Sequence, residues 1–348
     1  MDETIGRREF LQQMSAGVVG GMVAGKAIAA EATASAPASR PVPGPLGSRP
    51  EAAVIGTVRD LPTRRLGRTG IQVPPLSFGT APLGQGFFDS EPFEQVTNAA
   101  IDAGVSYIDT ALVYDVAEER LKPVLARRRK EVFLVTKAMK KSKDECLRSL
   151  EKSLTLMGVD NVDLGHIHNM GVFTTDEAIG KDSCLAGLRE AKKRGMIRHI
   201  GCTAHNLPAK LIPVLETGEI DVLMVTLNFV DRHTYNFEEK ILPLARKHDC
   251  GIVAMKVYGG ADADGGGYRK RASGRLVSEE DRQATIDYVL SIPGLASCVI
   301  GIKSLDELRM TIQAVRNFKP LEGSRREAVL AKGARIAKEW GEHLGPVA

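Results

Sequence analysis

Short β-rich runs alternate with longer helical stretches from about residue 61 to the end of this 348-residue chain. The helical stretches repeat apolar residues at three- and four-residue steps, as one face of a packed helix does. Parallel strands need helical crossovers, and a sheet that closes on itself leaves no exposed edge. The alternation therefore predicts an α/β fold, a (β/α)8 TIM barrel, which needs about 250 residues. The expected strands are 74–79, 105–109, 131–136, 162–167, 197–202, 221–226, 251–255 and 297–301, and the clearest helices are 91–103, 143–157, 182–194 and 304–316.

The alternative fold is an open, doubly wound sheet that binds a dinucleotide. Its fingerprint is G-x-G-x-x-G directly after the first strand. Here the first expected strand runs into Phe78-Gly79-Thr80-Ala81-Pro82, which lacks those glycines. The run Gly265–Gly267 comes late, between two expected strands, and is typical of a loop. A closed barrel is therefore favoured.

The start of the chain has the pattern of an export signal. Arg7 and Arg8 are followed by Phe10 and Leu11, then by a glycine-rich apolar stretch and triplets of small residues. A charged start, an apolar middle and an A-x-A end form a signal peptide. The arginine pair resembles a twin-arginine signal, which directs folded proteins across the bacterial inner membrane. A membrane anchor or a disordered tail is the alternative, but the apolar stretch is too short and glycine-rich for a transmembrane helix.

This pattern divides the chain into three predicted segments. Residues 1–32 are a twin-arginine signal peptide, and residues 33–60, rich in Ala, Pro, Gly and Ser, are a flexible linker. Residues 61–348 form the barrel. The protein is then expected to be exported to the periplasm, with the twin-arginine export machinery as a partner. Contact with the membrane is expected only if the leader is retained.

Charge and cysteine content exclude several kinds of partner and site. The 47 Lys and Arg residues against 43 Asp and Glu residues give a formal net charge of +4, which gives no reason to expect a nucleic-acid partner. The five cysteines are widely spaced and include no C-x-x-C pair. That spacing argues against a disulfide framework, a zinc knuckle or an iron–sulfur cluster.

Four polar residues are expected where the carboxyl ends of the strands meet, the rim at which TIM barrels carry their chemistry. Asp109 ends the second strand with Tyr114 five residues on, Lys137 ends the third, and His168 ends the fourth. A lysine ammonium lowers the pKa of a nearby tyrosine, and an aspartate holds the lysine charged and in place. A neutral histidine can donate a hydrogen bond to the same substrate oxygen. Such a group can polarise a carbonyl and deliver a proton as a hydride arrives.

The chain resembles the aldo-keto reductase family from about residue 62 to residue 318, because several motifs occur in the family's order. The matching segments are Leu66–Ile71 (an opening hairpin), Asp109–Tyr114 (D-T-x-x-x-Y), Val135–Lys137, Val162–Asn169 and Gly195–Gly201 (like G-K-I-R-x-I-G). The resemblance implies a barrel with a short N-terminal β-hairpin and a C-terminal helical tail. It also implies that Tyr114 is the general acid, that Lys137 and Asp109 tune it, and that His168 is the orienting donor. The implied reaction is NAD(P)(H)-dependent reduction of an aldehyde or ketone to an alcohol, or its reverse.

The resemblance further implies a nicotinamide cofactor across the mouth of the barrel, with NADP favoured and NAD possible. The residues expected to contact it are Gly79, Thr80, Asp109, Thr203, Met224, Lys256, Tyr258, Gly301, Lys303, Ser304 and Glu307. Lys303 would attract a 2′-phosphate, whereas the Glu307 carboxylate would repel one. Several positions depart from the family's pattern: Ala204 replaces a frequent asparagine, Met224 a usual glutamine, and Met255 an aromatic residue of some members. These departures spare the four catalytic positions.

Two other functions remain open on sequence alone. His166 and His168 form an H-x-H pair at a strand end, as in metal-dependent barrel hydrolases. A metal ion would need further ligands, which His205 or His233 would have to supply. No metal site is therefore predicted. The altered cofactor pocket also leaves room for a nicotinamide-binding sensor or regulatory subunit with little turnover, similar to potassium-channel β subunits. The expected pocket walls, which suit an apolar or aromatic carbonyl or alcohol, are Phe87-Phe88, the 258–276 loop and the tail around Trp340.

Overall fold

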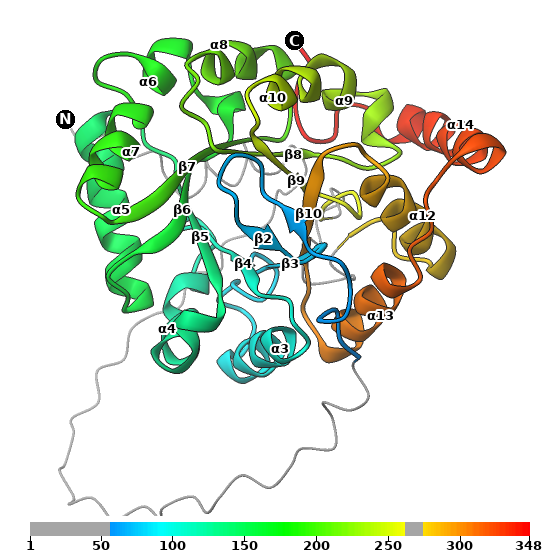
Figure 1. Ribbon diagram of the computed structural model, residues 1–348, viewed down its shortest axis with the longest axis horizontal. Helices are drawn as coiled ribbons and strands as arrows, with labels where there is room; N and C mark the ends of the chain where they lie inside the picture. The colour runs from blue at the N-terminus through cyan, green and yellow to red at the C-terminus, as the bar shows by residue number, and fades with distance from the viewer. Residues whose placement is uncertain (1–55, 262–273) are drawn as a thin grey trace, which may run out of the picture.

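The computed structural model describes residues 56–261 and 274–348. Within these ranges, eight parallel strands close into a barrel in the order β10-β3-β4-β5-β6-β7-β8-β9, and helices surround the ring (Figure 1). The predicted TIM barrel is therefore confirmed. The strands are β3 (Leu76–Gly79), β4 (Tyr107–Asp109), β5 (Phe133–Ala138), β6 (Val162–Ile167), β7 (Ile197–Ala204), β8 (Val222–Thr226), β9 (Gly251–Met255) and β10 (Leu295–Gly301). The predicted leader, residues 1–32, and the glycine run Gly265–Gly267 lie outside the described residues.

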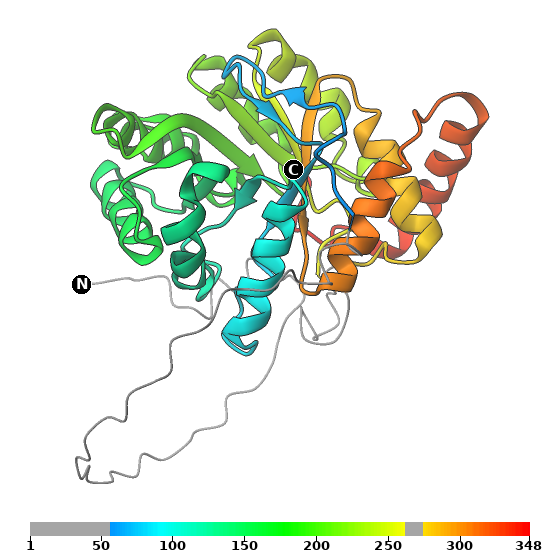
Figure 2. The ribbon, with the colours of Figure 1, turned by 60° about the horizontal axis from the view of Figure 1, so that its bottom comes forward.

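Helices follow the strands along the chain and cover the outside of the ring (Figure 2). Among the described residues they are α3 (Ser90–Asp102), α4 (Ala117–Arg128), α5 (Lys143–Met157), α6 (Thr175–Ile179), α7 (Cys184–Lys193), α8 (Leu211–Glu216), α9 (Phe237–Lys240), α10 (Leu242–Lys247), α12 (Glu279–Leu290), α13 (Leu305–Arg316) and α14 (Gly323–Trp340), with short 3-10 turns η1 (Arg129–Glu131), η2 (Met170–Val172), η3 (Pro208–Lys210) and η4 (Asp231–His233). Local signals set several ends: the Ser183 hydroxyl caps the start of α7, and Gly158, with a φ of 66°, ends α5. The four clearest predicted helices correspond to α3, α5, α7 and α13.

Successive side chains of each strand point alternately into the barrel and out towards the helices, so the apolar core consists of an inner and an outer cluster. On β9, Val253 and Met255 belong to the cluster inside the barrel, whereas Ile252 and Ala254 belong to the cluster under the helices. All four are buried, and burying a side chain such as Val, Ile or Met contributes roughly 1.5–3 kcal/mol. Because side chains fill the interior, a ligand site must lie at one end of the barrel.

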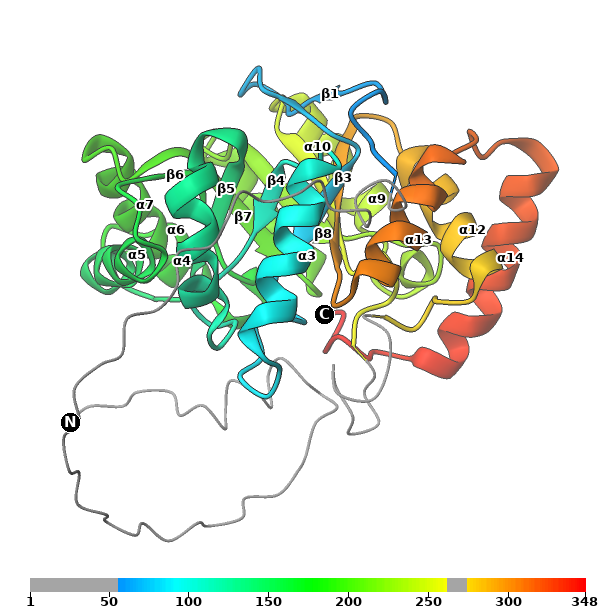
Figure 3. The same cartoon turned by 90° about the horizontal axis from the view of Figure 1, so that it is seen from below.

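A β-hairpin closes the end of the barrel where the strands begin. β1 (Arg64–Arg65) pairs antiparallel with β2 (Gln72–Val73), which confirms the predicted hairpin, and it lies at the end opposite the C-terminus (Figure 3). Leu66 from this hairpin is fully buried with the inner cluster. The turn needs glycine at position 67, where φ is 50° and a Cβ would lie 2.1 Å from the backbone nitrogen of Gly251.

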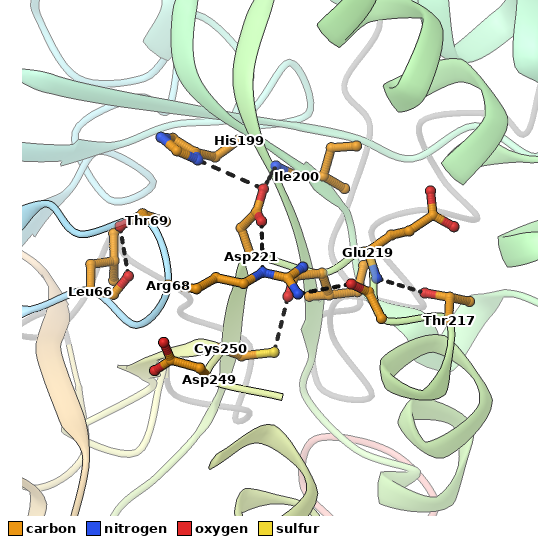
Figure 4. A network of polar contacts seen from close by, with 12 residues as sticks. Leu66, Arg68, Thr69, His199, Ile200, Thr217, Glu219, Asp221, Asp249 and Cys250 are labelled. Atoms are coloured by element: carbon orange, nitrogen blue, oxygen red, sulfur yellow. Dashed lines mark hydrogen bonds and ion pairs between the residues drawn. The ribbon is translucent and has the colours of Figure 1, made fainter. Parts of the chain in front are cut away.

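A polar network joins the hairpin to the barrel at this end (Figure 4). The Asp221 carboxylate accepts from Arg68 Nε at 2.9 Å and from the backbone N–H of Ile200 at 2.9 Å. Burial alone would raise the pKa of this carboxyl, but His199, the Ile200 N–H and the charge of Lys192 outweigh burial and hold the pKa well below its usual range. The carboxylate therefore stabilises the folded chain at neutral pH.

Replacing Asp221 by asparagine is expected to lower the free energy of unfolding by about 2 kcal/mol at pH 7, because the Arg68 guanidinium and its neighbours lose a charged acceptor. Since the pKa of Asp221 is depressed in the folded state, this contribution is complete above about pH 5 and is lost progressively as the pH falls below that value. The wild type should thus lose stability in acid more steeply than Asp221→Asn in urea melts run from pH 7 to pH 3. Glu219→Gln is the matched control: its pair with Arg189 is solvent-exposed, so a change above about 0.5 kcal/mol would contradict the assignment.

The chain beyond β10 returns to the opposite end of the barrel. α14 confirms the predicted helical tail, and the residues after it reach the mouth, where His343 Nε2 lies 2.7 Å from the Asp231 carboxylate. The backbone N–H of Leu344 donates to Tyr235 Oη at 2.8 Å, and Asn206 Nδ2 donates to the Pro346 carbonyl at 3.0 Å. The last residues therefore help to build the mouth of the barrel.

Among the described residues, packing against the barrel already includes Val58, which the sequence analysis assigned to the linker of residues 33–60. Val58 is 2% exposed, and its backbone N–H donates to the Ala103 carbonyl at 2.8 Å. Val58 belongs to the outer apolar cluster but lies outside every segment with a periodic apolar pattern. The sequence therefore did not indicate that it is buried. In the part of the chain that the structure describes, no helix is long and apolar enough to cross a membrane.

Candidate active site

Three neighbouring strands bring the predicted catalytic residues to one wall of the mouth. Asp109 is the last residue of β4, Lys137 lies near the end of β5, and His168 follows β6 directly. Lys137 points inward because it continues the alternation that places Val135 in the inner cluster. Tyr114 comes from the turn after β4, which returns its ring to the same wall. The four residues that the sequence predicted as a set therefore lie together.

Lys137 is the centre of this group. Its ammonium donates to Asp109 Oδ2 at 2.7 Å, to Tyr114 Oη at 3.1 Å and to the Thr110 carbonyl at 2.8 Å. It also lies 4.6 Å from the centre of the Tyr114 ring. The His168 ring meets the Tyr114 ring edge-on, with 5.8 Å between their centres. Negative charge on the Tyr114 oxygen would thus be stabilised by a cation in direct contact.

Burial controls the charges of the group. The side chains of Lys137 and Asp109 are 1% and 4% exposed. Burial lowers the pKa of Lys137 and raises the pKa of Asp109, and the attraction between them opposes both shifts. Burial, together with the charge of Lys137, holds the pKa of His168 well below its usual range. The His168 ring is therefore neutral at pH 7 and offers one N–H donor.

An open cleft lies beside Tyr114 at the mouth. Its lining is Gly79, Ala81, Pro82, Asp109, Tyr114, His205, Met224, Met255, Lys256, Val257, Tyr258, Gly260, Val299, Ile300 and Gly301. Six of the predicted cofactor residues belong to this lining, namely Gly79, Asp109, Met224, Lys256, Tyr258 and Gly301. Lys256 has a φ of 54°, a conformation that side chains other than glycine rarely adopt and that often marks functional sites.

Two predicted cofactor residues lie behind this lining and use their hydroxyls within the protein. Thr80 Oγ1 donates to the Asp109 carbonyl at 3.0 Å. Thr203 Oγ1 accepts from the backbone N–H of Asn169 at 2.8 Å, directly beside His168. Both hydroxyls therefore fix the backbone at or next to predicted catalytic residues, Asp109 and His168.

The last three predicted cofactor residues form the start of α13. Ser304 Oγ accepts from the Glu307 N–H at 3.1 Å, and Glu307 Oε2 accepts from the Lys303 N–H at 2.9 Å. These residues are outside the cleft lining, but they follow β10, whose end Gly301 is part of it. A helix N-terminus with an adjacent lysine favours an anion at this place.

The structure corrects two of the three predicted substrate walls, Phe87-Phe88 and Trp340, whereas Tyr258 and Gly260 of the predicted 258–276 loop line the cleft. Residues 262–273 of that loop lie outside the described residues. Phe87 is 43% exposed and is not part of the cleft lining. Trp340 packs under Gly259, and the Arg275 guanidinium lies 5.0 Å from the centre of the Trp340 ring. The apolar part of the lining includes Met224 and Met255 instead. Long loops were hard to place because no periodic pattern fixes their path.

His205 is one of the lining residues that the sequence analysis did not predict for the site; it was considered there as a possible metal ligand. It follows β7 at the carboxyl end, and that position was the available signal. Within residues 56–261 and 274–348, no group of three or more His, Cys, Asp or Glu residues is arranged to hold a metal ion.

Comparisons with known proteins give the family. The model described as "Aldo/keto reductase family" matches residues 75–285, more than half of the chain. A Bacillus subtilis protein described as the uncharacterized oxidoreductase YqkF is 25% identical over 291 residues, which cover 72% of this chain and 90% of that protein.

Solved structures share the fold. An aldo-keto reductase from Bacillus halodurans in its holo form has 20% identity and a TM-score of 0.61, covering 82% of this chain and 97% of that one. An aldo-keto reductase from Klebsiella pneumoniae in complex with NADPH has 20% identity and a TM-score of 0.58, covering 82% of this chain and 96% of that one. With the family model, the motifs and the barrel in agreement, the chain belongs to the aldo/keto reductase family.

Proposed function

We propose that this protein reduces an aldehyde or ketone to an alcohol, or catalyses the reverse, by hydride transfer with NADP(H) and with Tyr114 as general acid or base. One observation carries the proposal: the Lys137 ammonium contacts both the Asp109 carboxylate and Tyr114 Oη at the wall of an open cleft. That contact gives the tyrosine a cation that stabilises its phenolate at the moment it releases a proton.

Each residue has a defined part in this reaction. Tyr114 Oη donates a proton to the carbonyl oxygen, and Lys137 stabilises the phenolate that remains. Asp109 holds Lys137 in place as its buried counter-ion. Neutral His168 orients the same carbonyl oxygen by donating a hydrogen bond. The nicotinamide, when bound, supplies or accepts the hydride.

Positively charged groups in and near the cleft suit the phosphates of a nicotinamide dinucleotide. Lys256 is half-buried in the lining and makes no ion pair with a described residue. The N-terminus of α13 lies beyond it, with Lys303 at its start. We favour NADP over NAD because Lys303 would attract a 2′-phosphate, although the Glu307 carboxylate opposes it. The NADPH complex of the Klebsiella pneumoniae enzyme is consistent with this choice.

The test is turnover of NADPH, and separately of NADH, with an aromatic aldehyde. Oxidation of NADPH faster than NADH at equal concentration is the expected result. Binding of NADPH without turnover on a panel of aldehydes and ketones would contradict the proposal and favour a nicotinamide-binding sensor. Nucleotide retained through extensive dialysis would point to a tightly held cofactor, as a protein exported in folded form would need.

We also propose export of the folded protein to the periplasm through the twin-arginine route, supported by Arg7, Arg8 and the apolar stretch that follows. Replacing both arginines by lysine is expected to trap the protein in the cytoplasm, as measured by cell fractionation. Arg127→Lys with Arg128→Lys on α4 is the control and should leave the distribution unchanged. Equal periplasmic amounts of the wild type and the leader variant would contradict the proposal.

A further inference from the structure

The C-terminal tail reaches the mouth through a buried chain of hydrogen bonds. His343 Nε2 lies 2.7 Å from Asp231 Oδ1, and the two side chains are 4% and 1% exposed. The other carboxylate oxygen of Asp231 accepts from Asn228 Nδ2 at 2.6 Å. Asn228 Nδ2 also donates to the backbone carbonyl of Lys256, a residue of the cleft lining, at 3.0 Å. His343, Asp231 and Asn228, which we call the tail clasp, therefore connect the end of the chain to the cleft.

The Asn228 side chain has a single favourable orientation. It is fully buried, and its Oδ1 accepts from the backbone N–H groups of Val230 at 2.9 Å and Asp231 at 2.7 Å. Its Nδ2 carries two hydrogens, and the Asp231 carboxylate and the Lys256 carbonyl accept them. A flipped or displaced amide would leave buried polar groups without partners, which costs free energy. The position of the Asp231 carboxylate is therefore transmitted to the Lys256 carbonyl.

Lys256 needs this support because its backbone is strained. Its φ of 54° lies in the left-handed region, which a residue with a side chain keeps only when its surroundings hold it there. The Lys256 carbonyl also accepts from the N–H of Gly259 at 2.7 Å and so closes a tight turn. Lys256, Tyr258 and Gly260 of this segment line the cleft. The hydrogen bond from Asn228 therefore fixes a strained turn beside the ligand site.

The tail meets the same turn at a second point. Gly259 has a φ of 80°, and a Cβ at this position would lie 2.3 Å from Cη2 of Trp340. The Trp340 and His343 rings pack edge-on, with 4.9 Å between their centres. Earlier in α14, a Cβ on Gly333 would lie 2.1 Å from the carbonyl oxygen of Phe229, next to the tail clasp. These close contacts leave the tail little freedom to move away from the turn.

We propose that the tail clasp positions Lys256 for cofactor binding, so that the affinity for NADPH depends on His343. This inference rests on the proposed function, which places the cofactor phosphates at Lys256. A phosphate that takes no part in the reaction is bound equally in the ground state and in the transition state. His343 should therefore affect the dissociation constant and the KM of NADPH and leave kcat nearly unchanged.

The first test replaces His343 by leucine, which keeps an apolar side chain against Trp340 but cannot donate to the Asp231 carboxylate. In a fluorescence titration, the NADPH dissociation constant should rise roughly tenfold, since a hydrogen bond to a charged group is lost. The kcat for an aromatic aldehyde at saturating NADPH should stay within about twofold of the wild type. His343→Gln can still donate to Asp231 and should recover most of the affinity. If the leucine variant does not fold, His343→Ala leaves room for water at the carboxylate and should raise the dissociation constant by a similar factor.

A double-mutant cycle with Lys256→Met shows whether His343 acts through Lys256. Lys256→Met alone should raise the NADPH dissociation constant by roughly tenfold or more, because a phosphate loses its cation. If the clasp acts through Lys256, adding His343→Leu should raise the constant by less than about twofold further. Tyr235→Phe is the matched control. Tyr235 Oη accepts from the N–H of Leu344 at 2.8 Å, a contact of the tail outside the clasp, so this variant should bind NADPH within about twofold of the wild type.

An unchanged NADPH dissociation constant in His343→Leu would overturn the inference. The same increase on the Lys256→Met background as on the wild type would show that His343 acts independently of Lys256 and would also overturn it. An equal loss of affinity in Tyr235→Phe, with no recovery in His343→Gln, would reduce the effect to a general loosening of the tail. A wild type that binds NADPH but reduces no carbonyl would contradict the proposed function alone, because the dissociation constants still test the clasp. A wild type that does not bind NADPH would contradict both.

Discussion

Replacing Tyr114 by phenylalanine is expected to reduce kcat for carbonyl reduction by roughly 10²–10⁴-fold, the range for loss of a positioned general acid. The phenylalanine ring would keep the contact with the Lys137 ammonium, now 4.6 Å from the ring centre, and the edge contact with His168. Fold stability and NADPH affinity should therefore change little. Steady-state NADPH oxidation and a fluorescence titration of NADPH measure the two quantities separately.

Tyr107→Phe is the matched control for this experiment. Tyr107 lies on β4, two residues before Asp109, and its buried hydroxyl has no hydrogen-bond partner among the described atoms. Removing that hydroxyl leaves no donor or acceptor unpaired, so turnover should stay within a few-fold of the wild type. Equal turnover by Tyr114→Phe and the wild type would show that another group transfers the proton.

Replacing Lys137 by methionine is expected to lower the free energy of unfolding by roughly 3–5 kcal/mol, because the Asp109 carboxylate remains buried without its counter-ion. The pair is almost fully enclosed, with side chains 1% and 4% exposed and a separation of 2.7 Å. Activity should fall as well, since Tyr114 loses the cation beside its oxygen. Urea unfolding measures the first effect and NADPH oxidation the second.

The double variant Lys137→Met with Asp109→Asn separates these two effects. It removes both charges, so much of the lost stability should return, as replacement of a complete buried pair often costs little. Activity should remain low because the phenolate still lacks its cation. A double variant less stable than the single variant would mean that the Asp109 carboxylate interacts favourably with groups other than Lys137.

The sequence predicted the barrel and its catalytic wall because both depend on local patterns. Each strand was recognisable as a short β-rich run between helical repeats, and β5 carries Lys137 at its end. The carboxyl ends of parallel strands meet at one rim, so Asp109, Lys137 and His168 could be grouped without knowing the packing. Tyr114 followed from its fixed spacing after Asp109.

Contacts between segments that lie far apart in the chain could not be predicted from the sequence. Thr80 and Thr203 were predicted to contact the cofactor; in addition, the Thr80 hydroxyl donates to the Asp109 carbonyl and the Thr203 hydroxyl accepts from the Asn169 N–H. The part of Asn206 in fixing the mouth depends on Pro346, a residue 140 positions away. Such roles depend on burial and partner geometry, which no spacing along the chain reveals.

The central claim is hydride transfer from the cofactor to a carbonyl carbon, and isotope transfer tests it most directly. NADPH carrying deuterium at C4 of the nicotinamide, in each of its two stereoisomers, would be incubated with the protein and phenylglyoxal. The account predicts that one stereoisomer gives an alcohol with deuterium on the former carbonyl carbon and that the other gives none. An alcohol without deuterium from either form, or NADPH oxidised with no alcohol formed, would contradict it.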